Sequence, residues 1–254
     1  MPVLRGAEPY HHSGGSVGAL LCHGFTGTPQ SMRPWAQYLA AAGLTVALPR
    51  LPGHGTSWQD ANMTNWSDWY SCVEREFVAL RERCEQVFVM GLSMGGTLAL
   101  RLAQCNGSAV AGVVVVNPSV LGRDPRLRLL PVLHRFIGSF PAIGDDIRKP
   151  GVHELAYDRN PLRALESLRR TWPTVQADLP RVTQPVLLMR SYTDHIVESE
   201  SSAMVLARVS SRDVTEIVLH DSYHVATLDH DAPRIFDASL EFVRRLAPAA
   251  AERP

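Results

Sequence analysis

Lysine is almost absent from this chain of 254 residues, where Lys149 is the single example. A Gly-Lys-Ser/Thr phosphate loop needs a lysine after its glycine, and no such sequence occurs here. A Schiff-base enzyme would have to use Lys149, which stands before Pro150 in a turn-like stretch. The shortage of lysine therefore argues against both kinds of chemistry.

An excess of charge and a long apolar run are also missing. Lys+Arg (25) balance Asp+Glu (25), whereas nucleic-acid binding needs a clustered basic surface. Uninterrupted apolar runs such as Val113–Val116 are far shorter than the roughly 18 residues of a transmembrane helix. The first residues include Arg5 and Glu8 and do not resemble a signal peptide. We expect no nucleic-acid partner and no transmembrane segment.

Cysteine is sparse, and its spacing matches no metal site. The chain has 4 cysteines, which are scattered through core-like segments: Cys22, Cys72, Cys84 and Cys105. Three disulfide pairings are conceivable, but four reduced thiols in a cytoplasmic protein is the favoured interpretation. We therefore predict a cytoplasmic location.

Short apolar runs alternate with amphipathic stretches through most of the chain. The predicted strands are Ser16–Cys22, Leu44–Leu48, Gln86–Met90, Ala109–Val116, Pro185–Arg190 and Asp213–Leu219. Predicted helices lie near Ser31–Ala42, Trp66–Cys84, Glu200–Val209 and Pro233–Leu246, with another that ends near Cys105. This alternation predicts an α/β fold with a mostly parallel sheet and helices on both faces.

The interval 119–183 breaks the alternation, because it is much longer than one crossover helix requires. Leu162, Leu165 and Leu168 have helical spacing, which favours an inserted helical cap over a long, partly ordered loop. We therefore predict an α/β core formed by residues 1–118 and 184–254, with an inserted cap formed by 119–183.

The strongest local motif is Gly91-Leu92-Ser93-Met94-Gly95-Gly96, which follows an apolar strand and opens a helix. A reversal this tight strains the backbone of the central residue, and flanking glycines relieve the crowding. The Ser93 hydroxyl then projects at the C-terminal edge of the sheet, beside a helix N-terminus. We predict Ser93 as the nucleophile; the alternative is an ordinary N-capping serine.

A serine nucleophile needs a base, and the chain offers 10 histidines. His224 follows the last predicted strand, whose C-terminal end shares an edge with the strand before Ser93. His195, His220 and His54 are its rivals. Where a serine lies in such a strand–turn–helix motif, the acid and then the histidine follow it along the chain. This order favours His224, because His195 would leave few acids between itself and Ser93.

The acid should orient the imidazole and stabilise its protonated form. Asp194 follows a predicted strand at the same edge of the sheet. Asp221 lies so close to His224 that shaping the loop suits it better, and Asp213 opens a strand at the opposite edge. We predict Asp194 as the acid.

The backbone N–H groups of Met94 and Phe25 are the predicted oxyanion donors. Met94 directly follows the nucleophile, and Phe25 lies in the turn after the first core strand. His220 and His224 lack the adjacent glutamate and the helix of a zinc motif, and no dinucleotide fingerprint occurs. We expect neither a metal nor another cofactor.

Several stretches in family order resemble the α/β-hydrolases, and specifically the small carboxylesterases and monoacylglycerol lipases of bacilli. The matching stretches are Leu21–Gly27, Pro52–Gly55, Gly91–Gly96, Asp194-His195 and Ser222–Asp229. Lys149–Tyr157 is similar to the monoacylglycerol lipase branch. That similarity implies that Glu154 contacts the glycerol hydroxyls and that Ile143 forms part of the acyl-pocket wall.

The resulting hypothesis is a serine hydrolase that cleaves carboxylic esters, with monoacylglycerols or similar single-chain lipids as the favoured substrates. The alternatives are a general carboxylesterase, a lactone or thioester hydrolase on the same fold, and a non-catalytic ligand receptor. The apolar cap residues are expected to line or cover an acyl tunnel: Phe136, Ile137, Phe140 and Ile143. Acyl length and oligomeric state stay open.

Overall fold

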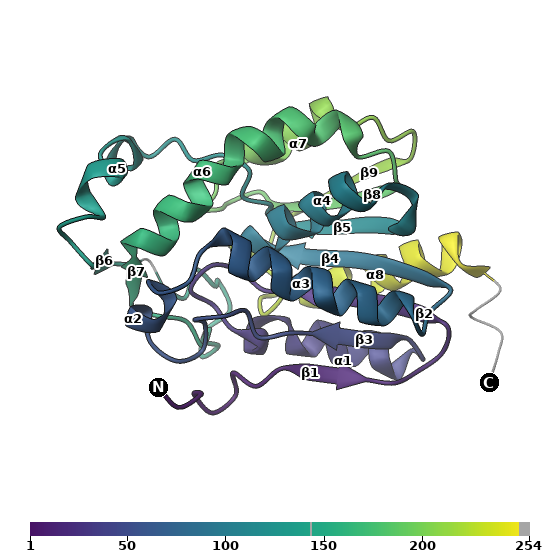
Figure 1. The fold of residues 1–254 in the computed structure, drawn as a ribbon. Helices are drawn as coiled ribbons and strands as arrows, with labels where there is room; N and C mark the ends of the chain where they lie inside the picture. The colour runs from purple at the N-terminus through teal and green to yellow at the C-terminus, as the bar shows by residue number, and fades with distance from the viewer. Residues whose placement is uncertain (143, 249–254) are drawn as a thin grey trace.

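The computed structural model describes residues 1–142 and 144–248 and contains a sheet of seven strands in the order β1-β3-β2-β4-β5-β8-β9 (Figure 1). All neighbouring strands run parallel except β1 and β3. The strands are β1 Tyr10–His12, β2 Val17–Cys22, β3 Thr45–Leu48, β4 Gln86–Leu92, β5 Gly112–Val116, β8 Val186–Ser191 and β9 Val214–Leu219. The predicted mostly parallel α/β fold is confirmed.

Helices connect these strands, and a small hairpin lies apart from the main sheet. The helices are α1 Arg33–Ala41, α2 Trp58–Ala61, α3 Trp66–Arg81, α4 Met94–Asn106, α5 Leu130–Leu133, α6 Leu162–Asp178, α7 Ser199–Arg208 and α8 Ala232–Leu246. Short 3-10 turns cover Pro29–Met32, Gly107–Ala109, Pro125–Arg128 and Leu179–Arg181. Strands β6 Ser139–Pro141 and β7 Arg159–Pro161 pair in antiparallel fashion.

Each face of the sheet is covered by its own layer of helices. In the central strand β4, Val87 and Val89 pack into the cluster that contains residues of α3, α4, α6 and α7. Phe88 and Met90 point to the other face and join the cluster that contains residues of α1 and α8. Strand side chains alternate between faces, so a strand buried on both sides is apolar throughout. This burial explains the continuous apolar runs in the sequence.

The structure corrects the predicted strands at two places, β1 and the start of β5. Strand β1 was not expected, and it pairs with β3 at the edge of the sheet with His11 and His12 exposed. An exposed edge strand needs no apolar alternation, so its sequence gives little signal. Strand β5 starts at Gly112 and not at Ala109, because Gly107–Ala109 forms a 3-10 turn after α4.

Residues 119–183 include α5, α6 and the hairpin of β6 and β7. Helix α5 and the hairpin lie beyond the C-terminal ends of the parallel strands, at the left of Figure 1. Helix α6 also packs against the core, since Leu168, Trp172 and Val175 join the cluster under α3 and α4. Residues 144–158, which we call the strap, run back over the core. The strap is fastened where Tyr157 Oη donates a 2.7 Å hydrogen bond to Gly53 O and Gln30 Nε2 donates a 3.1 Å bond to His153 O.

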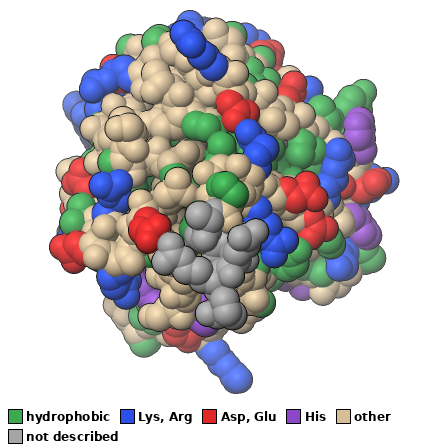
Figure 2. All heavy atoms as spheres, turned by 90° about the vertical axis from the view of Figure 1, so that its right-hand side faces the viewer, with side chains coloured by type: hydrophobic (Ala, Val, Ile, Leu, Met, Phe, Trp, Pro, Cys, Tyr) green, Lys and Arg blue, Asp and Glu red, His purple; other side chains and the backbone are tan. Residues whose placement is uncertain are grey.

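The surface carries mixed charge, in keeping with the formal net charge of +0. On the face shown in Figure 2, basic and acidic side chains lie interspersed among polar and apolar ones. Across the described ranges, none of the helices has both the length and the apolar character that crossing a bilayer would demand.

Two glycines allow β2, β4 and α4 to meet in one tight junction. A Cβ on Gly91 would lie 2.2 Å from Gly95 C, and a Cβ on Gly95 would lie 1.9 Å from Cys22 O. Both distances are far inside van der Waals contact, and the atoms approached are backbone atoms that cannot move aside. The first turn of α4 can therefore lie against the end of β2 only if these residues are glycine.

We predict that Gly95→Ala lowers the free energy of unfolding by about 1–3 kcal/mol or more, because overpacking usually costs this much. Gly144→Ala is the matched control, because nothing lies within 4 Å of the added methyl group. The control should be neutral or slightly stabilising, since alanine reduces the entropy of the unfolded chain. Urea unfolding of both variants measures the difference, and equal stability would contradict the proposed role of Gly95.

Candidate active site

Ser93 lies between β4 and α4 with φ 57° and ψ −120°, in a region that non-glycine residues rarely adopt. Such a conformation costs on the order of 1–3 kcal/mol and persists only where neighbours hold it. Ser93 N donates to Val116 O at 3.0 Å, and Ser93 O accepts from Thr97 N and Ser119 N, both at 3.2 Å. These bonds hold the strained conformation of the residue, and Ser93 lines a cavity.

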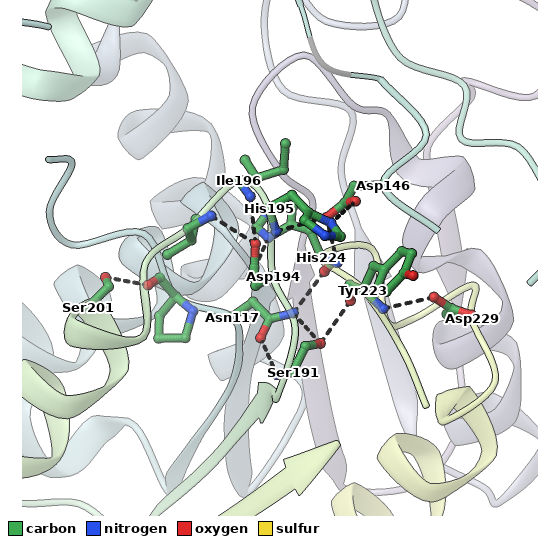
Figure 3. A network of polar contacts seen from close by, with 12 residues as sticks. Asn117, Asp146, Ser191, Asp194, His195, Ile196, Ser201, Tyr223, His224 and Asp229 are labelled. Carbon is green, nitrogen blue, oxygen red and sulfur yellow. Dashed lines mark hydrogen bonds and ion pairs between the residues drawn. The ribbon is translucent and has the colours of Figure 1, made fainter. Parts of the chain in front are cut away.

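His224 and Asp194 come from the loops that follow β9 and β8. His224 Nδ1 and Asp194 Oδ2 are 2.8 Å apart, and their side chains are only 8% and 9% exposed. Asp194 Oδ1 accepts two further 2.8 Å hydrogen bonds, from the backbone N–H groups of Ile196 and Val197. Asp194 is therefore held on its own loop with one oxygen directed at the imidazole (Figure 3).

The charges around the pair favour an imidazolium. Burial by itself lowers the pKa of His224, but the charge and hydrogen bond of Asp194, with the charges of Glu154 and Asp146, raise it above its usual value. Burial raises the pKa of Asp194, and the interaction with His224 and the two backbone donors outweighs this and lowers it. The pair is thus suited to hold a proton on the histidine.

Ser93, His224, Met94, Phe25 and Glu154 line one cavity of about 360 Å³. Among the described residues, Ser93 Oγ makes no hydrogen bond to the His224 ring. Bonds of this kind are often long in enzymes without substrate, so their absence does not oppose the candidate roles of Ser93 and His224. The cavity joins the candidate nucleophile, the candidate base and both candidate oxyanion donors.

The backbone next to Phe25 passes close to the nucleophile. A Cβ on Gly24 would lie 3.5 Å from Ser93 Cβ, so the turn after β2 is in contact with the elbow. Met94 is the first residue of α4, where backbone N–H groups have no partner inside the helix. Phe25 and Met94 therefore adjoin residues of the elbow and line the same cavity as Ser93, which suits their N–H groups to an oxyanion hole.

The rival histidines have other surroundings. His54 is buried, and burial lowers its pKa to about 4. His220 stacks on the Tyr192 ring, at 5.5 Å between centroids. His195 lines the cavity, but its Nδ1 lies 2.7 Å from Asp146 Oδ1 and not against Asp194. Of these histidines, His224 alone is bonded to the candidate acid in the described structure.

The buried His23, which precedes Gly24, has a structural position. Its Nε2 accepts a 3.1 Å hydrogen bond from Leu51 N, so the proton is on Nδ1, which donates to Gly24 O at 2.9 Å. Burial, with smaller effects of His54 and Arg50, lowers the pKa of His23 to about 3. A neutral His23 thus links the turn after β2 to the loop after β3.

Glu154 lies on the strap with its carboxylate against the turn after β2. A Cβ on Gly27 would lie 2.6 Å from Glu154 Oε1, so a side chain there would displace the carboxylate. Burial raises the pKa of Glu154 to about 7, although His224 and Ser31 oppose the rise. A carboxylate with this pKa changes charge near neutral pH, within the cavity that contains Ser93.

The predicted apolar wall is only partly correct. Phe140 lines the cavity, but Phe136 is 82% and Ile137 46% exposed, so the prediction that they face an acyl tunnel is wrong. Their place is taken by Leu165, Leu168 and Trp172 of α6. Sequence shows which residues are apolar but not which surface of a short helical turn they occupy. Ile143 lies outside the described residues.

Two polar residues that the sequence did not single out hold the loops of the triad. Asn117 Nδ2 donates to His224 O at 2.8 Å and to Ser191 Oγ at 3.0 Å. Asp229 Oδ2 accepts from Tyr223 N at 2.9 Å (Figure 3). Asn117 directly follows β5 at the C-terminal edge, which is the one sequence signal that could have identified it. No group of three or more potential metal-ligating side chains occurs within the described ranges.

The fold and this site define an α/β-hydrolase with a serine at its elbow. The chain matches the family described as "Serine aminopeptidase, S33" over residues 18–231, and it belongs to that family. The resemblance inferred from the motifs is confirmed.

Two bacterial relatives and one solved structure are similar over nearly the whole chain. The chain is 43% identical to the thermostable monoacylglycerol lipase of Bacillus sp. (strain H-257), over 97% of this chain and 98% of that protein. It is 25% identical to a carboxylesterase of Bacillus subtilis (strain 168), over 94% of this chain and 97% of that protein. A structure reported for the metagenome-derived lipolytic enzymes LipS and LipT has a TM-score of 0.94 and 39% identity, and the match covers 96% of this chain and 100% of that chain.

Asp194 and Asp221 can be separated by one exchange at each. We predict that Asp194→Asn lowers kcat by roughly 10⁴-fold, as in another triad enzyme, because the amide no longer stabilises the imidazolium. Asp221→Asn should have little effect, since the Asp221 side chain is 69% exposed and contacts Arg148. Hydrolysis of p-nitrophenyl butyrate measures both variants. A larger loss in Asp221→Asn would transfer the acid role to Asp221.

Proposed function

We propose that this chain is a serine hydrolase of carboxylic esters, with Ser93, His224 and Asp194 as its catalytic triad. One observation carries the proposal: a strained elbow serine lines the same cavity as a buried histidine that lies 2.8 Å from an aspartate whose side chain is 9% exposed. The names of the relatives, a monoacylglycerol lipase and a carboxylesterase, agree with this chemistry.

The reaction proceeds through an acyl-enzyme. Ser93 Oγ attacks the ester carbonyl carbon while His224 takes its proton, and the N–H groups of Phe25 and Met94 stabilise the oxyanion. As the tetrahedral intermediate collapses, His224 protonates the departing alcohol. Water then attacks the acyl carbonyl with His224 again as the base, which releases the acid and restores Ser93. These steps need no cofactor.

We propose monoacylglycerols as the preferred substrates. Phe140, Leu165 and Trp172 offer apolar contact to an acyl chain, and each buried methylene contributes up to about 0.8 kcal/mol. Glu154 lies in the same cavity and can accept hydrogen bonds from glycerol hydroxyls in its ionised form. The family description names a peptidase, but an apolar wall beside Ser93 suits an acyl chain better. A general carboxylesterase without a glycerol site is the alternative.

We also propose that residues 119–183 act as a cap on a core formed by 1–118 and 184–254. Side chains of this segment, including Phe140, Leu165 and Trp172, line the cavity of Ser93, which supports a role of the segment in substrate binding. A cytoplasmic location is proposed on the ground that all four cysteines are free thiols. The partner that this proposal requires is a small ester with a single lipid chain.

Removal of the nucleophile tests the triad. We predict that Ser93→Ala loses nearly all hydrolysis of monoacylglycerols, on the order of 10⁶-fold in kcat, as in another triad enzyme. The exchange removes one buried hydroxyl, so thermal unfolding should be cooperative as in the wild type. Substantial turnover by a folded Ser93→Ala protein would remove Ser93 from the mechanism.

Glu154 can be tested by comparing two substrates with the same acyl chain. We predict that Glu154→Leu lowers kcat/KM for a monoacylglycerol roughly tenfold more than for the p-nitrophenyl ester, because a hydrogen bond to a charged group is lost. The change in charge near His224 affects both substrates, so their ratio isolates the glycerol contact. Glu154→Gln is the size-matched control and should lose less. Equal losses on both substrates would leave a general carboxylesterase.

A further inference from the structure

Besides Asp194 and Glu154, a third carboxylate lies close to His224. It belongs to Asp146 of the strap. Asp146 is only 9% exposed, and within the described residues its carboxylate pairs with His195 and with no arginine or lysine. Asp146 Oδ1 lies 2.7 Å from His195 Nδ1, and Asp146 Oδ2 accepts from His195 N at 3.2 Å and from His224 N at 3.1 Å. A buried carboxylate with these partners is a built site and not a surface charge.

These contacts join the two loops that carry the acid and the base. His195 directly follows Asp194 on the loop after β8, and His224 lies on the loop after β9. One oxygen of Asp146 accepts from the backbone of both loops, and Asp146 O accepts a further 3.1 Å bond from Val225 N. Figure 3 shows Asp146 beside His195 and His224, with Asp194 on the adjacent side. The distance between Asp194 and His224 thus depends on a residue of the strap.

We propose that Asp146 is a positioning residue for the catalytic base. Its hydrogen bonds fix the backbone of His224 relative to the loop that carries Asp194. Its negative charge stabilises the imidazolium that forms when Ser93 attacks. Because Asp146 belongs to the strap, full catalytic competence requires that the strap be seated on the core. This inference rests on the triad proposed above.

The charges that face His224 come from three segments. Asp194 and His195 lie on the loop after β8, and Glu154 and Asp146 lie on the strap. On the loop after β9, the Asp229 carboxylate is directed at backbone N–H groups and does not shift the pKa of His224. Asp145, which contacts His153, acts on Glu154. Asp194, Glu154 and Asp146 each raise the pKa of His224. Loss of any of these three charges should therefore lower the pKa of His224.

The test is the pH dependence of kcat/KM for p-nitrophenyl butyrate in Asp146→Asn. The amide keeps the size and one acceptor oxygen but loses the charge, so the acid limb of the profile should move to lower pH. We expect kcat at the plateau to fall roughly tenfold, the effect of weakening one bond to a charged group, with KM within about twofold. A purely structural carboxylate would not move the acid limb.

Asp229→Asn is the matched control, because Asp229 also accepts backbone N–H groups of the His224 loop, including Tyr223 N at 2.9 Å, and is not among the charges that shift the pKa of His224. It should lower the melting temperature and leave the acid limb in place. An unchanged acid limb in folded Asp146→Asn, or an equal shift in Asp229→Asn, would overturn the proposal.

His195→Leu keeps the proposal testable if Asp146→Asn does not fold. This variant removes a donor from Asp146 and leaves its charge less compensated beside His224, so the acid limb should move to higher pH, opposite to Asp146→Asn. No movement, or movement to lower pH, would contradict the inference. Failure of the proposed function gives a different result: the wild-type protein would show no esterase turnover. Failure of the inference would show turnover in the wild type but no shift of the acid limb in the variants.

Discussion

The contact between the ends of β2 and β4 and the first turn of α4 is the constraint on which the rest of the site depends. Gly91 and Gly95 leave no room for a side chain at this junction, and the chain must reverse direction at Ser93 with positive φ. The bonds from Ser93 to Val116 and Thr97 hold this conformation against its cost. The same junction brings the turn after β2 beside Ser93, so it places the proposed nucleophile next to the proposed oxyanion donors.

The position of the proposed base, His224, depends on a different set of contacts, whose residues are distant in the sequence. The loops after β8 and β9 are held from the core by Asn117 and from the strap by Asp146. Burial alone would keep His224 neutral, so its proton affinity comes from the carboxylates around it. Two of these, Glu154 and Asp146, belong to the segment that also borders the substrate cavity. The strap thus connects substrate binding with the proton transfer that we propose.

The core strands and the candidate triad could be predicted from sequence because each has a local signal. Central strands are apolar on both faces, and Ser93, Asp194 and His224 each follow a strand at one edge. Asp146 has no such pattern, since its partners lie 49 and 78 positions away in the chain. For Phe136 and Ile137 the signal in the sequence was misleading. Both residues are apolar, which predicted burial, but both are exposed in the structure. Local chemistry was predictable, whereas long-range contacts and the facing of short segments were not.

The most direct test of the account is covalent trapping of the nucleophile by a fluorophosphonate, followed by mass spectrometry of the digested protein. A strained serine beside a histidine and an oxyanion hole should react once per chain, with the adduct on the peptide that contains Ser93. The rate should fall at acid pH, where His224 is protonated and cannot take the serine proton. An adduct on another side chain, or no adduct on the folded protein at neutral pH, would contradict the account.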